Sequence, residues 1–520
     1  MDAGAQSTEC TTWGHCTLLP PRFGFVGAEE PQVNIAESDP YAIYKHFLTD
    51  EILRLVVDET NRYAHQFIST HQLRRRSLMR KWKDTTAKEI EKFFGIIMIM
   101  GIVQLPQLRL YWSKNLMYRN ELIVRLMTRN RFELLLKCLH FCNNDDIADD
   151  TEKLFKVEKV TNLAITQFIQ AVDPGKDVVI DETMIPWRGR LSFRQYIPGK
   201  AHKYGVKLYK LCTVEGYTWN LKVYCGKEAR DRRPTGKLHS ENVVMTLMKD
   251  LLLSGRELYV DNFYTSLSLT EALLAKQVFL CGTLRQKRKG NPQEVCNKKL
   301  KKGEVIGVEN EHGIRVIKWM DKRSVLMMTS KPEHFDVLVS TGRKNRLNED
   351  VEKPLAVINY NHAKKGVDIS DQMSSYYTCV RKTIKWYKKV FFEILLGAAV
   401  VNAWYVHCRI TGKKMQMLRF REALIAGMIT ENTDEEDNLP TTSGASKSAA
   451  GKTSKQKHQL ARYEGTARAS RKRCTACYRK VQKNEGAEVA RKKAKRVMTY
   501  CKECEGMPAL CLDCFNEKHS

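Results

Sequence analysis

Two aspartates stand directly after short apolar runs that have the composition of β-strands. Asp181 follows the run at 178–180, and Asp261 follows the run at 258–260. If the two strands are neighbours in one sheet, both carboxylates emerge at the same edge. Carboxylate oxygens suit Mg²⁺, and two such ions about 4 Å apart can promote phosphodiester cleavage. The pair therefore predicts a metal-dependent site for phosphodiester chemistry.

Two further carboxylates, Asp368 and Asp371, are three residues apart, so they share a face if a helix begins near Gly366. These positions also suit N-terminal helix caps, and an aspartate at a strand end is usually a turn residue. Spacing alone therefore leaves all four aspartates open between a catalytic and a structural role.

The tail holds a second set of residues with metal-binding chemistry. Six of the 16 cysteines form three Cys-x2-Cys pairs, which are Cys474 and Cys477, Cys501 and Cys504, and Cys511 and Cys514. With His519 they supply seven ligands, whereas two closed tetrahedral zinc sites need eight. We expect His458 to be the eighth. Such a domain serves DNA binding or, as in a RING-like ubiquitin ligase, protein binding, and its fold does not decide between them.

Composition narrows the class of partner. Lysine and arginine number 87 against 59 acidic residues, which gives a net charge of +28. This excess favours a polyanion, because neutralised phosphates release their counterions. Nucleic acid is the leading partner, and an anionic membrane surface is second.

The apolar runs and the other cysteines predict a soluble, intracellular protein. The runs at 93–103 and 390–406 are too short or too polar to span a bilayer, so we interpret them as core helices. No secretory signal pattern opens the chain. The ten cysteines between Cys10 and Cys408 read as reduced core residues.

The first two aspartates lie in a segment whose pattern predicts an α/β fold with a mixed sheet. The β-rich runs are 177–186, 204–214, 217–225, 257–263 and 278–284. Helical spacing at 240–253 and 266–276 separates the last three runs. Three strands followed by helix, strand, helix and strand is the order of a ribonuclease-H-like core.

Other segments flank or interrupt this core. Residues 39–174 predict an all-helical domain, with a capping-box spacing at Thr86 and Glu89, that is completed by 378–430. The remaining predicted parts are a disordered arm (1–38), the two parts of the core (175–287 and 356–377), a β-rich insertion (288–355), a flexible linker (431–457) and a cysteine-rich zinc domain (458–520). Within the linker, residues 444–453 end in Gly-Lys-Thr, but Ser446 stands where a P-loop needs glycine, so we expect no nucleotide cofactor.

The motifs around the aspartates resemble those of piggyBac-type transposases. The matching blocks are Ile180-Asp181-Glu182 with 187–190, 196–200 and 204–207, then 260–266, and then 360–373 followed by Arg381-Lys382-Thr383. The likeness covers about residues 39–425 and the tail. It implies a cut-and-paste transposase that nicks transposon ends, excises through hairpins and integrates at TTAA. The alternative is a domesticated transposase-derived DNA-binding or chromatin protein that does not cleave.

The resemblance also assigns roles to residues. It implies that Asp181, Asp261 and Asp368 bind Mg²⁺ or Mn²⁺, with Asp371 as a fourth essential acidic residue. Glu182 is expected to face away, since it is the next residue along the strand. The resemblance further implies a helical dimerisation and DNA-binding domain and a cross-braced tail with two Zn²⁺.

Basic residues near the expected active edge predict contacts with the phosphates of double-stranded DNA. They are Arg188, Arg190, Lys200, Lys203, Lys207, Arg285, Lys287, Arg381 and Lys382. Trp386 and Tyr387 suit base stacking or core packing, and their helical spacing favours the core. Basic runs at 471–473 and 491–496 suit DNA contact or nuclear localisation. We expect a nuclear homodimer that acts on transposon terminal inverted repeats and TTAA targets.

Overall fold

The computed structural model describes residues 12–17, 23–32, 38–146, 153–200, 202–226, 238–346, 348–380, 385–430, 458, 460–463, 471–502, 504 and 506–519. The chain divides into two compact units, Met1–Asn432 and Thr433–Ser520. The predicted linker 431–457 lies outside the described residues.

The first unit begins with the predicted helices. They are α1 (Pro40–Lys45), α2 (Asp50–Thr70), α3 (Ala87–Ile102), α4 (Glu121–Leu126), α5 (Arg129–Cys138) and α6 (Phe155–Ala171). The Thr49 side chain caps α2, and Thr86 caps α3 by accepting from the Glu89 backbone N–H at 3.3 Å. The capping-box threonine thus fixes the start of α3 as the sequence predicts, whereas the Glu89 carboxylate bonds Thr85 and Arg131.

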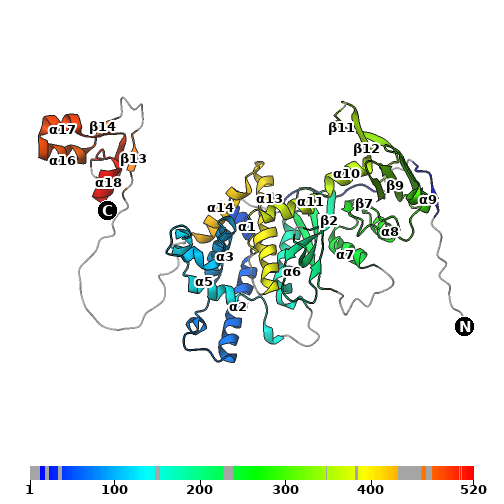
Figure 1. Cartoon of the computed structure of the whole chain (residues 1–520), viewed down its shortest axis with the longest axis horizontal. Coiled ribbons are helices and arrows are strands. Elements are labelled where there is room, and N and C mark those ends of the chain that lie inside the picture. The colour runs from blue at the N-terminus through cyan, green and yellow to red at the C-terminus, as the bar shows by residue number, and fades with distance from the viewer. Residues whose placement is uncertain are drawn as a thin grey trace. The chain divides into compact units, whose positions relative to one another are not determined.

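Helices from the far end of this unit pack on these first ones. They are α12 (Trp386–Glu393), a π-helical turn (Ile394–Ala398), α13 (Ala399–Thr411) and α14 (Met417–Ile429). Tyr44 of α1 donates to the Leu395 carbonyl at 2.8 Å, and α14 packs against α3 (Figure 1). The stretch Trp386–Thr411 is long and apolar enough to cross a membrane, but 94% of its most apolar window is buried inside the protein. It is therefore a core helix, as the sequence predicts.

The central sheet follows the predicted order of elements. Its first strands are β2 (Asp177–Pro186), β3 (Gln195–Tyr196), β4 (Tyr204–Thr213), β5 (Thr218–Val223), β6 (Glu257–Val260) and β7 (Phe279–Thr283), with α7 (His239–Leu247) before β6 and α8 (Leu267–Leu274) before β7. β2, β6 and β7 are parallel neighbours, and β4 pairs antiparallel with β2 and β5. The mixed sheet of the sequence analysis is confirmed.

The inserted strands continue this sheet. Helix α9 (Gln293–Asn297) precedes β8 (Val305–Asn310), β9 (Arg315–Met320) and β10 (Ser324–Thr329), and a hairpin of β11 (Leu338–Lys344) and β12 (Asp350–Pro354) follows. β10 pairs antiparallel with β7, so the sheet reaches ten strands. The sequence analysis expected an inserted β-rich subdomain. Its strands extend the central sheet because β10 pairs with the free edge of β7, a pairing that no local pattern reveals.

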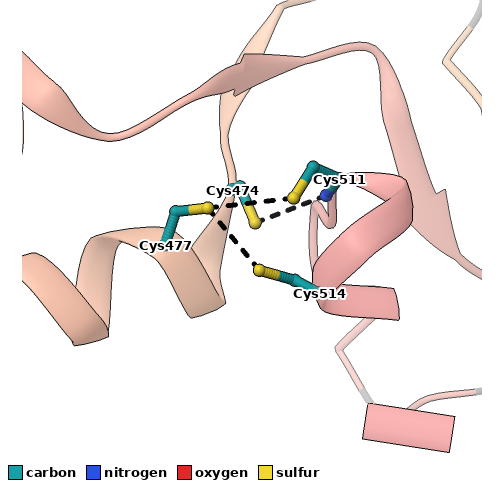
Figure 2. Close-up of side chains that lie close together, drawn as sticks. All are labelled: Cys474, Cys477, Cys511 and Cys514. Carbon is teal, nitrogen blue, oxygen red and sulfur yellow. Dashed lines mark hydrogen bonds between the residues drawn. The ribbon is translucent and has the colours of Figure 1, made fainter. Parts of the chain in front are cut away.

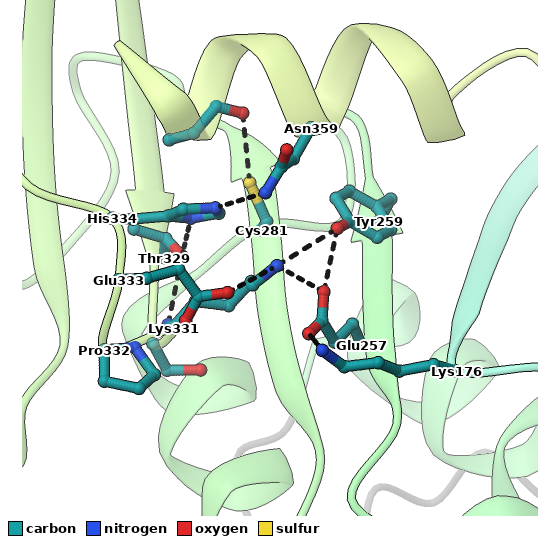
Figure 3. A network of polar contacts seen from close by, with 12 residues as sticks. Lys176, Glu257, Tyr259, Cys281, Thr329, Lys331, Pro332, Glu333, His334 and Asn359 are labelled. Atoms are coloured by element: carbon teal, nitrogen blue, oxygen red, sulfur yellow. Dashed lines mark hydrogen bonds and ion pairs between the residues drawn. The ribbon is translucent and has the colours of Figure 1, made fainter. Parts of the chain in front are cut away.

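A buried polar network also ties the insertion to the sheet (Figure 3). The Lys331 ammonium, just after β10, pairs with the Glu257 carboxylate at the start of β6. Tyr259 donates to the same carboxylate at 2.9 Å. His334 bonds Thr329 of β10 at 2.8 Å and Asn359 at 3.0 Å. These contacts join β6, the end of β10 and the helix that carries Asn359. They lie at the end of β6 opposite Asp261.

The N-terminal segment is structured where it is described. β1 (Trp13–Gly14) pairs antiparallel with β8, and Pro31 forms a bridge with Val172 after α6. Phe23 stacks on Phe279 of β7 with ring centroids 4.3 Å apart. The expectation of a disordered arm is therefore wrong for residues 12–17 and 23–32. The segment shows no periodicity because it is held by single contacts with distant strands.

Helices cover both faces of the sheet. α10 (Leu355–Ala363) and α11 (Gly366–Ser375) pack with Val179, Cys212 and Tyr259 on one face. α7 and α8 pack with the alternate residues, such as Val178 and Leu258, on the other face. Because side chains alternate along a strand, Asp181 shares the α11 face with Val179.

The second unit is small and built around cysteines. It contains β13 (Leu460–Arg462), β14 (Lys472–Arg473), α16 (Thr475–Glu485), α17 (Ala487–Lys493), β15 (Arg496–Val497), β16 (Thr499–Cys501) and α18 (Leu512–His519). The long basic spacing between Cys477 and Cys501 contains α16 and α17, which are separated at Gly486, whose φ of +87° suits glycine.

Candidate active site and metal centres

The strand register brings the first two aspartates together. β2 and β6 run parallel with Ile180 opposite Val260, and Asp181 and Asp261 are the next residues on each strand. Neighbouring strands lie about 4.8 Å apart, so the two residues occupy adjacent positions on one face. β2 continues to Pro186, however, so Asp181 lies within its strand. The sheet edge predicted from the sequence therefore corresponds to the end of β6 and not to the end of β2.

Burial and neighbouring charge perturb both carboxyls. Burial raises the pKa of Asp181 to about 7, the Lys200 ammonium opposes this rise at 3.9 Å, and Glu182 adds to it. Burial also raises the pKa of Asp261, while the Phe263 backbone N–H, at 2.9 Å, lowers it. The negative charge of Asp181 raises the pKa of Asp261 further. Two partly desolvated carboxyls that repel one another form a donor set that a divalent cation would stabilise.

Helix α11 carries the other two aspartates over the same face. At Gly366, its first residue, a Cβ would lie 2.2 Å from the Thr213 carbonyl oxygen and 2.6 Å from Val179. Only glycine permits so close an approach between the start of α11 and strands β2 and β4. Asp368 follows two residues later and is exposed.

Asp371 is bound to the sheet. Its carboxylate accepts from Thr183 of β2 at 2.8 Å and from the Lys210 ammonium of β4 at 2.9 Å. Lys210 is fully buried and lies opposite Asp181 in the antiparallel register. Asp371 therefore anchors α11 to the two strands, and this contact sets the position of Asp368 one turn earlier.

The aspartates form an open group. Among the described residues, the sets of metal-binding side chains whose ligand atoms all lie within 4.8 Å of one another belong to the second unit. Asp181, Asp261 and Asp368 do not gather so closely. This spacing suits Mg²⁺, which keeps several waters and is bound by a few carboxylates together with substrate phosphate.

Most of the predicted DNA contacts have exposed side chains. Exposed side chains are those of Arg188, Arg190, Lys203, Arg285 and Lys287, and that of Lys200 is half-buried beside Asp181. The predictions for Arg381 and Lys382 lie outside the described residues.

Lys207 is the exception, and the structure contradicts its predicted contact with DNA. Its side chain is buried, and its ammonium lies 4.4 Å from the ring centroid of Tyr209, 4.7 Å from that of Tyr224 and 5.3 Å from that of Phe263. Burial lowers the pKa of Lys207. A lysine enclosed by three aromatic rings is a structural cation that phosphate cannot reach.

Trp386 and Tyr387 belong to the core, as their spacing favours. Tyr387 is buried and packs edge-on against Phe141 at 6.1 Å, and Trp386 packs edge-on against Phe193 at 5.1 Å. The buried Tyr387 ring is therefore not placed to stack on a DNA base, and Trp386 is partly buried against the same core.

The second unit gathers two groups of thiols. Cys474, Cys477, Cys511 and Cys514 form the first (Figure 2). The Cys477 sulfur lies 3.8 Å from that of Cys511 and 3.5 Å from that of Cys514. Tetrahedral zinc with Zn–S bonds of about 2.3 Å spaces its sulfurs about 3.8 Å apart, so the donor set fits zinc. The Cys511 backbone N–H donates to the Cys474 sulfur at 3.3 Å, a contact that stabilises a thiolate.

The second group contains His458, Cys501 and Cys504. The His458 Nδ1 atom lies 3.4 Å and 3.5 Å from the two sulfurs. The two groups interleave along the chain, since the middle Cys-x2-Cys pair belongs to one group and the outer pairs to the other. His519, the eighth predicted ligand, ends α18, and its side chain is not among those described.

Sequence reasoning missed three residues that shape the aspartate site, Gly366, Thr183 and Lys210. The sequence held a signal for Lys210. It stands among apolar residues in β4, a strand that also carries Lys207, and a charge on a buried strand needs a partner.

Comparison with known proteins identifies the class. The family model described as Transposase IS4 matches residues 39–404, which is more than half of the chain, so the chain belongs to this transposase family.

The individual proteins that it resembles are piggyBac proteins. It is similar to two human proteins, PiggyBac transposable element-derived protein 3 (27% identical over 397 residues, 74% of this chain and 64% of that protein) and PiggyBac transposable element-derived protein 2 (25% over 434 residues, 80% and 70%). The chain thus spans less than two thirds of the first relative. It also matches the cryo-EM structure of a piggyBac transposase synaptic complex with hairpin DNA, with a TM-score of 0.65 and 25% identity, over 80% of this chain and 89% of that one.

Proposed function

We propose that this chain is an active cut-and-paste DNA transposase that nicks transposon ends, excises through hairpin intermediates and integrates at TTAA. The observation that carries the proposal is the adjacency of Asp181 and Asp261 on parallel strands, with α11 held over the same face. The strand order β5-β4-β2-β6-β7 supports a ribonuclease-H-like core for this chemistry.

Each aspartate has a distinct part in the proposal. Asp181, Asp261 and Asp368 hold divalent cations, Mg²⁺ or Mn²⁺, which would supply activation of the attacking oxygen and stabilisation of the leaving one. Asp371 binds Lys210 and keeps α11 in place. The chain itself contributes position and charge, which is the main requirement of phosphodiester transfer.

The basic surface supports DNA as the partner. The net charge of +28 and the exposed Arg188, Arg190, Lys203 and Arg285 suit backbone phosphates. The similar solved structure is a complex with hairpin DNA. We further propose that the protein acts as a homodimer in the nucleus on terminal inverted repeats. The second unit would hold two Zn²⁺, with His519 completing the group of His458, Cys501 and Cys504.

The test is a cleavage assay on duplexes that carry candidate transposon ends flanked by TTAA. The chain should nick them and form hairpins when Mg²⁺ is added, and Asp261→Asn should abolish both products without weakening duplex binding. Asp250→Asn, an exposed aspartate of the same unit, is the matched control and should cut normally. Cleavage by Asp261→Asn at the rate of the unaltered chain would refute the proposed site.

A second candidate is a transposase-derived protein that binds DNA without cutting it. The names of the human relatives, which describe element-derived proteins, favour it. Tight binding to terminal repeats with no cleavage by the unaltered chain would select this function.

A further inference from the structure

A cavity rich in basic side chains opens beyond the end of β2. It has a volume of about 590 Å³, which is within the usual range of ligand sites, and it is lined by Pro186, Arg188, Arg194, His202, Lys203 and Tyr204. The segment 186–204 contains five lysines or arginines and no acidic residue. Among the described residues, Arg188 and Lys203 have no carboxylate partner. The cavity therefore suits an anionic ligand.

Two aromatic rings stand exposed beside this cavity. Tyr196 of β3 and Tyr204 of β4 are paired in the register, and their ring centroids are 4.7 Å apart. Tyr196 is 54% exposed and Tyr204 is 45% exposed, and the Arg194 guanidinium lies 5.3 Å from the Tyr204 ring centroid. Neither ring belongs to the described core clusters, so core packing does not account for them.

Exposed rings among cations match one class of ligand. Cations bind phosphates, and an exposed aromatic face stacks on a nucleic-acid base of any sequence. In a duplex the base faces are covered by the neighbouring base pairs, so only an unpaired nucleotide can offer one. The combination therefore selects single-stranded DNA over a duplex.

We propose that Tyr196 and Tyr204 form a stacking platform for unpaired nucleotides of a DNA strand, whose phosphates lie against Arg188 and Lys203. The platform is joined to the aspartate site, because Lys200, between the two tyrosines in sequence, approaches Asp181 at 3.9 Å. This proposal rests on the proposed function for its substrate, since strand opening at a transposon end supplies the unpaired nucleotides. It assigns base stacking to this pair rather than to the buried Tyr387.

The test measures binding apart from cleavage. The full chain, with neither Mg²⁺ nor chelator added so that zinc is retained, is titrated into a fluorescent 12-nucleotide oligothymidine and into a duplex of equal length. The double variant Tyr196→Ala/Tyr204→Ala should bind the single strand about 5- to 150-fold more weakly, the effect of losing one stacked base. Its duplex affinity should stay within twofold. Tyr196→Phe/Tyr204→Phe is the matched control and should bind as the unaltered chain does, because stacking needs the ring and not the hydroxyl.

A single strand that contains 2-aminopurine gives a direct readout, because its fluorescence is quenched when the base stacks. Quenching should occur with the unaltered chain and the Phe variant and be lost with the Ala variant. An equal loss of single-strand and duplex affinity in the Ala variant would overturn the proposal, as would unchanged single-strand affinity. Failure of the proposed function appears separately, as stacking by a chain that does not nick DNA.

Discussion

Replacing Lys210 with methionine tests whether α11 is held over the aspartates by one buried ion pair. Lys210 is fully buried and donates to Asp371 at 2.9 Å. Burial would lower the pKa of Lys210, but the Asp371 carboxylate raises it well above its usual range, so the ammonium stays charged. Methionine keeps most of the volume and removes the charge. The substitution leaves the Asp371 carboxylate without its cation.

The expected loss follows from the burial of the two partners. Removing one member of a buried pair typically costs about 3 to 5 kcal/mol. The Asp371 side chain is 29% exposed and can regain some water, so the lower end, about 3 kcal/mol, applies. Glu393 increases the cost, because it is a second carboxyl that Lys210 stabilises, and partial burial already raises its pKa.

Urea unfolding followed by tryptophan fluorescence reports the stability of the first unit, because all eight tryptophans precede residue 433. Lys210→Met and Asp371→Asn should each destabilise the first unit. The double variant should lose less than the sum of the two by at least about 1 kcal/mol, since the second change removes a group that already lacks its partner. Additive losses would refute the ion pair as the anchor. Both single variants should also cut DNA more slowly, because Asp368 lies one turn from the anchor.

Three other predictions follow from the geometry. Gly366→Ala should destabilise the first unit by about 1 to 3 kcal/mol and abolish cleavage but not DNA binding, because the new Cβ meets a backbone carbonyl of β4 at 2.2 Å; Gly24→Ala, with open space, should change neither. Burial lowers the pKa of His140 to about 3, so the unfolded chain binds the proton first and stability should fall by up to about 1.4 kcal/mol per pH unit below about pH 6.5. Urea titrations at pH 7 and pH 5 should show this loss and a smaller one in His140→Phe. Cys477→Ser should remove one zinc per chain by elemental analysis, whereas Cys225→Ser, a buried cysteine of the other unit, should leave the zinc content unchanged.

The strands that carry the first two aspartates were predictable because strands are encoded locally. The run at 177–186 has the composition of a strand, and β2 has those same bounds. The adjacency of Asp181 and Asp261 was only conditional in the sequence, because it requires β2 to pair with β6 across the intervening β3, β4, β5 and α7. The helical domain was predictable for a similar reason, since Thr86 caps α3 through a contact three residues away.

The parts that escaped prediction depend on residues far apart in the chain. β10 completes the edge of β7, and β1 pairs with β8 almost 300 residues later. The sequence of a short strand does not indicate which distant strand it pairs with. Gly366 is similar, because the requirement for glycine appears only once the Thr213 carbonyl lies against it.

The two lysines of β4 have different roles because side chains alternate between the two faces of a strand, although the sequence alone does not distinguish them. Lys207 and Lys210 are three residues apart, so their side chains leave opposite faces of the sheet. Lys210 therefore meets Asp371 of α11, on the face that carries Asp181, and fixes that helix. Lys207 instead enters a cluster of rings that includes Phe263, two residues beyond Asp261. Each lysine thus supports one side of the aspartate site, and neither is free to hold DNA.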